Sequence, residues 1–122
     1  MMRKKGKQTL LAGVLALLGL VSQPLWAHAH QVDQVPAEGE VAAQSPTHFE
    51  LRFDTPIRIT QFEVQGPEGT VELSERSLGK LAQDHRVVPV DALAPGEYRV
   101  VWRGLAEDGH TMSGDYRFSI RE

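Results

Sequence analysis

Apolar and charged residues alternate along short segments of this chain. Between positions 49 and 53, Phe, Leu and Phe are separated by Glu and Arg, the period-2 pattern of a strand with one buried face. Similar apolar segments occur at 57–64, 71–73, 87–90, 98–103 and 116–120, with turn residues between them. This spacing predicts six or seven strands, about 8–12 residues apart, in an antiparallel β-sandwich.

Two segments add detail to this prediction. Residues 74–84 contain Leu78 and Leu81 three positions apart, and a helical turn or a loop is expected there. Residues 93–98 read Leu-Ala-Pro-Gly-Glu-Tyr, which predicts a tyrosine corner, in which the Tyr98 hydroxyl binds upstream backbone. In that motif Leu93 enters the core and the Pro-Gly pair turns the chain.

The first 27 residues have a different pattern. The first seven positions contain four basic residues, Arg3, Lys4, Lys5 and Lys7, and residues 8–21 carry no charge. The apolar stretch from 9 to 21 has 13 residues, fewer than the roughly 20 that a helix needs to span a bilayer. These features predict a cleavable helical signal peptide over residues 1–27, one domain over residues 28–122, and export of that domain.

Two cleavage positions fit the small-residue rule for signal peptides. A cut after Ala27 leaves His28 as the new N-terminus, whereas a cut after Ala29, the better A-x-A match, leaves His30. In both cases the processed chain begins with histidine.

Composition excludes several classes of protein. The 122 residues suffice for one domain and are too few for the large α/β barrels. The chain has no Cys, which excludes disulfides, thiolate metal sites and thiol nucleophiles. Without the four basic residues of the leader, nine basic side chains remain against 16 acidic ones, a net charge of -7. This balance gives no indication of a nucleic-acid partner.

Histidine and carboxylate positions indicate metal chemistry. A terminal His28 carries an α-amine and an imidazole that can chelate one ion, and Cu(II) favours such tetragonal nitrogen and oxygen donors. An α-amine has an ordinary pKa of about 7.7–8.0, so it loses its proton readily near neutral pH. Asp108 and His110 lie two residues apart between the strands predicted at 98–103 and 116–120. With His28 they would complete a near-planar set of four donors.

These residues resemble the CopC/YobA family of periplasmic copper-binding proteins. The resemblance covers residues 28–122. It rests on His28, the Pro-Ala-Glu-Gly segment at 36–39, the strand at 49–53, the segment 93–103, and Asp-x-His at 108–110 followed by Gly114. It implies a seven-stranded Ig-like or cupredoxin-like Greek-key β-sandwich, a histidine brace that holds Cu(II), and a role in copper tolerance or uptake. It also implies an inner-membrane partner of the CopD type.

The metal ligands of the family fall on His28, Asp108 and His110, with one Cu(II) expected per chain. The distance from His28 to Pro36 matches the family and favours cleavage after Ala27. For Asp108, a second role is open, in which it orients His110 from outside the coordination sphere.

Two features differ from the family pattern. Some members have an additional Glu ligand where this chain has Thr55, and the neighbouring Asp54 is expected to face the other side of its strand. Some members also have a Met-rich Cu(I) site, whereas Met112 is the only Met after the leader. We therefore expect a protein that binds Cu(II) alone, with Met112 packing against the core.

The other histidines are expected to have lesser roles. With His28 first, His30 is third from a free amine, a motif that can wrap Cu(II) with the amine, two backbone amides and the imidazole. A solvated strand position is the preferred interpretation of His30. His48 and His85 are expected at the surface, and the core is expected to contain Tyr98, Trp102 and Phe118.

The sequence thus predicts an exported protein that carries or buffers Cu(II) and is not an enzyme. One alternative is a copper-dependent oxidase or mono-oxygenase that uses the same brace. Such an enzyme needs an open coordination position and a substrate-binding face, commonly aromatic, whereas the aromatic residues here are mostly expected in the core. The other alternative is a metal-free sandwich that acts as an interaction module.

Overall fold

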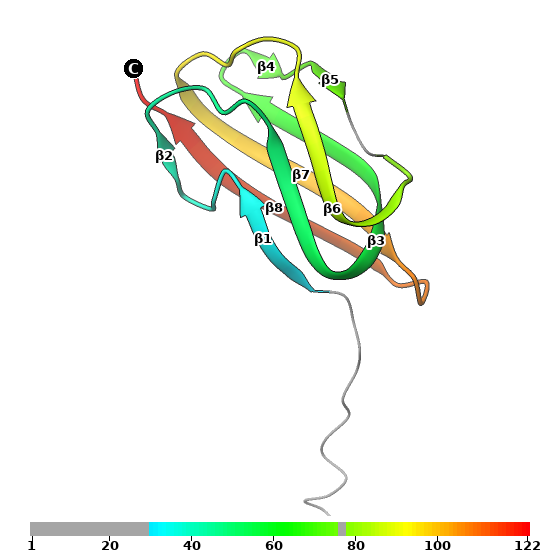
Figure 1. Ribbon diagram of the computed structural model, residues 1–122. Coiled ribbons are helices and arrows are strands. Elements are labelled where there is room, and N and C mark those ends of the chain that lie inside the picture. Colours follow the sequence, from blue (N-terminus) through cyan, green and yellow to red (C-terminus); the bar gives the residue numbers. More distant parts are fainter. Residues whose placement is uncertain (1–29, 76–77) are drawn as a thin grey trace, which may run out of the picture.

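The computed structural model describes residues 30–75 and 78–122. These residues form a β-sandwich, which confirms the predicted fold class (Figure 1). Its strands are β1 (Gln31–Val35), β2 (Val41–Ala42), β3 (Phe49–Gly66), β4 (Gly69–Thr70), β5 (Leu73–Glu75), β6 (Leu81–Pro89), β7 (Gly96–Ala106) and β8 (Thr111–Ile120). The described part of the chain contains no helix, and therefore none that could cross a membrane. The predicted signal peptide and His28 lie outside the described residues.

Strand β3 belongs to both layers of the sandwich. Its first half pairs antiparallel with β1 and β6, so that Phe49 lies opposite Val87. Its second half pairs with β7, where Phe62 lies opposite Trp102. One layer therefore has the order β1-β3-β6-β5, and the other has the order β3-β7-β8-β2. The short strand β4 forms a hairpin with the end of β3.

The strand changes layer at residues 54–56. Pro56 has no backbone N–H to donate to a ladder, and a proline within a sheet is confined to edges and irregularities. Asp54 and Thr55 are both exposed, and burial resumes at Ile57, four positions after the buried Phe53. The register with β6 shifts between Arg52 and Ile57. This bend places the Asp54 side chain at one end of the sandwich.

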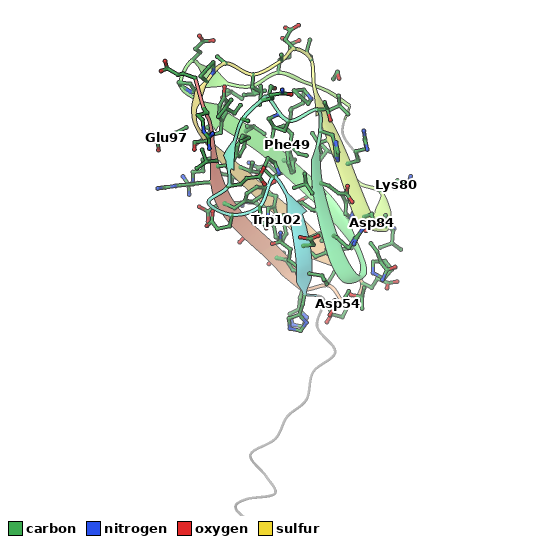
Figure 2. The ribbon with its side chains drawn as sticks, turned by 60° about the vertical axis from the view of Figure 1, so that its left-hand side comes forward. Phe49, Asp54, Lys80, Asp84, Glu97 and Trp102 are labelled. Carbon is green, nitrogen blue, oxygen red and sulfur yellow. The ribbon has the colours of Figure 1, made fainter. Side chains whose placement is uncertain are left out.

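The core lies between the two layers and is largely aromatic. The rings of Phe53 and Trp102 meet edge to face with centroids 5.2 Å apart, a favoured geometry for aromatic pairs. The rings of Phe49 and Phe118 are tilted relative to each other, with centroids 5.9 Å apart. Figure 2 shows Phe49 and Trp102 inside the sandwich. The predicted burial of Tyr98, Trp102 and Phe118 is confirmed, and Met112 packs against this core as expected.

The predicted tyrosine corner is also confirmed. The Tyr98 hydroxyl donates a hydrogen bond to the carbonyl oxygen of Ala94 at 2.5 Å, and the Tyr98 ring stacks on Phe118. Gly96 has a φ of 140°, a conformation that side-chain-bearing residues rarely adopt. Leu93 is partly buried against the core, as the motif requires.

Two expectations about β5 and β6 can be compared with the structure. Of the helical turn or loop expected at residues 74–84, the described part shows the loop: residues 78–80 connect β5 to β6, which begins at the exposed Leu81. His85 was expected at the surface but is 1% exposed, because it lies two residues before Val87 on the inward face of β6. Its ring meets the edge of Phe53, and its Nε2 lies 2.8 Å from the Ala82 carbonyl oxygen. His48, just before β3, is half-buried.

Candidate metal centre

Asp108 and His110 meet in the turn between β7 and β8, and we call them the hairpin pair. His110 Nδ1 lies 2.9 Å from Asp108 Oδ2, and the His110 backbone N–H donates to Asp108 Oδ1 at 3.0 Å. The Ala106 N–H donates to the His110 carbonyl oxygen at 2.9 Å, which closes the turn. Gly109 lies between the two side chains with a φ of 93°, so the turn depends on a residue without a Cβ. Both side chains remain substantially exposed.

His30 and Asp54 form a second histidine–carboxylate contact, which we call the junction pair. His30 directly precedes β1, and its backbone N–H donates to Asp54 Oδ1 at 2.7 Å. Its Nδ1 lies 3.3 Å from Asp54 Oδ2, and its carbonyl oxygen accepts from the Asp54 N–H at 3.0 Å. The Gln83 side-chain amide in turn donates to the Asp54 carbonyl oxygen at 3.0 Å. Residue 30 is therefore fixed on the bend of β3.

Both pairs lie at the same end of the sandwich. Ile57, three residues after Asp54, is paired with Ala106, and Ala106 is hydrogen-bonded to His110. In Figure 1 the beginning of β1, the bend of β3 and the β7–β8 turn all lie at the lower end of the ribbon. Figure 2 shows Asp54 close to the beginning of β1. The chain therefore enters β1 at the end of the molecule that carries Asp108 and His110.

The predicted ligands are partly brought together. Asp108 and His110 are in contact, whereas the third predicted ligand, His28, lies outside the described residues. Within residues 30–75 and 78–122, no three His, Cys, Asp or Glu side chains form a group that could hold a metal. The described residues thus supply two histidine–carboxylate pairs.

The junction pair was missed by sequence reasoning. Asp54 was expected to face away from Thr55 because successive strand residues alternate, but alternation stops at the bend and both residues are exposed. His30 and Asp54 are 24 positions apart, so no local pattern signals their contact. The proline at position 56 is the one sequence feature that indicates an irregular strand at this point.

The electrostatics of this end favour a cation. The hydrogen bond from the His30 N–H is the largest cause that lowers the pKa of Asp54 from its ordinary value, so this carboxylate is anionic near neutral pH. The two pairs present imidazole nitrogens and carboxylate oxygens, and the described residues include no Cys. Imidazole and carboxylate donors suit Cu(II) and similar divalent ions better than Cu(I), which prefers sulfur. The chemistry of the residues is therefore compatible with Cu(II).

The architecture and site define the class of protein. It is a small two-layer β-sandwich with histidine–carboxylate pairs at the end where the first strand begins. The family model described as the CopC domain matches residues 31–121. The chain therefore belongs to the CopC domain family.

Individual relatives agree with this assignment. Protein YobA of Escherichia coli (strain K12) is 31% identical over 113 residues, which cover 88% of this chain and 91% of that protein. Copper resistance protein C of Pseudomonas syringae pv. tomato is 29% identical over 112 residues, covering 84% of this chain and 87% of the relative. The crystal structure of CopC from Methylosinus trichosporium OB3b superposes with a TM-score of 0.63 at 26% identity, covering 76% of this chain and 93% of that one.

Proposed function

We propose that this protein is an exported, periplasmic Cu(II)-binding protein that carries or buffers copper. The ligands are the amine and imidazole of a processed His28 together with Asp108 and His110, with one Cu(II) per chain. The observation that carries the proposal is the contact between Asp108 and His110 at the end of the sandwich where the chain enters β1. The name of the Pseudomonas syringae relative, copper resistance protein C, supports copper as the metal.

The hairpin pair brings two of the proposed ligands together before copper binds. Asp108 Oδ2 contacts His110 Nδ1 in the metal-free chain, and Asp108 would exchange this contact for the metal when it binds as a ligand. The carboxylate also offsets the charge of the cation. Because the turn is closed by backbone hydrogen bonds, the imidazole is positioned before the metal arrives, and little ordering entropy is lost on binding.

The proposed activity is equilibrium binding and transfer, without turnover. The large aromatic side chains of the described residues lie in the core rather than on a face that could bind a substrate. A CopD-type membrane protein is the proposed recipient or donor of the copper.

Titration of the processed chain, beginning at His28, with Cu(II) tests the proposal through the visible d–d band. We expect one ion per chain, and we expect His110→Ala to weaken binding by at least about 100-fold, more than the loss of an outer-sphere partner costs. The control variant is His48→Ala. His48 directly precedes β3, its Nε2 lies 3.5 Å from Glu50 Oε1, and its removal should leave the affinity within about twofold. Unchanged binding in His110→Ala would refute the proposed ligand set.

Two further measurements address the terminus and the oxidase alternative. One additional residue before His28 moves the amine out of chelation range, so Cu(II) binding should weaken by about tenfold or more. The copper-loaded protein should produce no sustained peroxide with ascorbate and oxygen. Sustained turnover would instead support an oxidase.

A further inference from the structure

A processed chain that begins His28-Ala29-His30 offers Cu(II) two mutually exclusive sites. In the proposed brace, the α-amine and the His28 imidazole act with the hairpin pair. In the alternative, the same amine binds together with the backbone amide nitrogens of Ala29 and His30 and the His30 imidazole. Because both sites use the single α-amine, one ion at the terminus occupies one or the other.

The alternative site needs two particular atoms of His30. One is the backbone nitrogen, which loses its proton to solvent when it binds copper. The other is Nδ1, the ring nitrogen nearer the backbone, which closes a six-membered chelate ring with that amide. In the structure both atoms contact one carboxylate: the amide N–H donates to Asp54 Oδ1 at 2.7 Å, and Nδ1 lies 3.3 Å from Asp54 Oδ2.

Asp54 is itself held in place. Its backbone N–H donates to the His30 carbonyl oxygen at 3.0 Å, so residue 30 is tied to the bend of β3 on three atoms. The side-chain amide of Gln83 on β6 binds the Asp54 carbonyl oxygen at 3.0 Å. An amide N–H that donates to a carboxylate cannot bind a metal at the same time, and rotation of His30 away from the bend would break these contacts.

We infer that Asp54 is a specificity-determining residue, which occupies the backbone nitrogen and Nδ1 of His30 and thereby directs Cu(II) from the terminal tripeptide to the hairpin pair. This inference rests on the proposed function, because it explains why Cu(II) at the processed terminus would bind in the brace rather than in the tripeptide site. In this role Asp54 acts through His30 and is not a metal ligand.

The test compares the Cu(II) d–d band and electron paramagnetic resonance spectrum of the processed wild type with those of Asp54→Ala. Deprotonated amides are stronger-field donors than imidazole or carboxylate, so the variant's band should move to shorter wavelength. The shift should disappear in the double variant Asp54→Ala/His30→Ala. In the Asp54→Ala background, His110→Ala should cost less than about threefold in affinity, whereas in wild type it costs at least about 100-fold.

Two matched variants complete the design. Asp54→Asn keeps an oxygen that can accept the His30 N–H, so its spectrum should stay close to that of wild type. Asp84→Ala removes the same charge from the neighbouring strand, where Asp84 pairs with Arg52, and should leave the spectrum unchanged.

Two results would overturn the inference. One is an Asp54→Ala variant that keeps the wild-type band. The other is an equal loss of affinity in Asp54→Asn and Asp54→Ala without a band shift, which would make Asp54 a ligand. Wild-type binding that is independent of His110 would instead overturn the proposed function.

Discussion

The hairpin pair and the junction pair contain the same types of side chain, but the first is a local contact within a turn and the second is a contact between distant parts of the chain. In each, a histidine Nδ1 approaches a carboxylate oxygen, at 2.9 Å for Asp108–His110 and 3.3 Å for His30–Asp54. The first pair joins residues two positions apart in one turn, whereas the second joins residues 24 positions apart, one directly before β1 and the other within β3. One contact is made by local backbone geometry, and the other exists only because β1 lies beside β3.

The core residues behind the two regions differ, although two of them, Phe53 and Trp102, meet edge to face. Behind the junction, the buried His85 packs on Phe53, the residue before Asp54. Behind the hairpin, Gly114 of β8 lies directly against the Trp102 ring of β7. The two regions should therefore respond to different substitutions, and the four predictions below separate them.

The largest effect is expected on the hairpin side, from Gly114→Ala. A Cβ at this position would lie 2.8 Å from Trp102 Nε1, inside a buried contact that has no room for it. Overpacking of this kind costs about 1–3 kcal/mol in the free energy of unfolding, which thermal denaturation will measure as a lower Tm. Ser113→Ala, at the neighbouring exposed position, is the control and should change Tm little. An unchanged Tm in Gly114→Ala would show that the strands can separate at no cost.

On the junction side, His85 should make the fold sensitive to acid. Burial lowers the pKa of His85 from its ordinary value of 6.5, so below that pH the unfolded chain binds the proton more readily than the folded one. Stability is therefore lost as pH falls below 6.5, by at most about 1.4 kcal/mol per pH unit. Urea denaturation of the metal-free protein between pH 5 and 7.5 should show a shallower pH dependence in His85→Phe than in wild type. Parallel curves would contradict this prediction.

A smaller effect is expected from Gly109→Ala within the hairpin turn. No atom lies within 4 Å of the added Cβ, so the whole cost comes from the φ of 93°. That cost is about 1 kcal/mol, and Asn, which tolerates positive φ better than Ala, should recover part of it. Chemical denaturation will measure the loss, and nuclear magnetic resonance of the His110 ring will show whether its contact with Asp108 is displaced. The His30 signals should not change.

The smallest effects are local and distinguish the pairs directly. In the metal-free protein, Asp54→Ala should accelerate hydrogen exchange of the His30 amide and the first amides of β1, because it removes the acceptor of the His30 N–H. Asp108→Ala should do the same for the His110 amide and leave β1 unchanged. Exchange measured by nuclear magnetic resonance will show both, and acceleration at both ends by either variant would mean that the two pairs are coupled.

Much of the fold was predictable because alternation has a direct physical cause. Residues 49–53, 98–103 and 116–120 place every second side chain in the core, and the Leu93–Tyr98 motif forms the tyrosine corner that was expected. His85 was missed because a histidine contributes no apolar signal, although it occupies an inward position of β6 two residues before Val87. The leucines at 78 and 81 left a helical turn and a loop open, and the described residues 78–80 form the loop before β6.

The candidate site also has features that the sequence predicts and features that only the tertiary structure sets. By itself the sequence determined the sandwich and the tyrosine corner, and it placed Asp108 and His110 in one turn, since each follows from the alternation or turn pattern of a few neighbouring residues. Only the tertiary structure decided that His85 is buried and that Asp54 binds His30, because these depend on which strands lie side by side and where β3 bends at Pro56. Contacts within a turn are set by a handful of dihedral angles, whereas contacts between strands are set by the packing of the whole core.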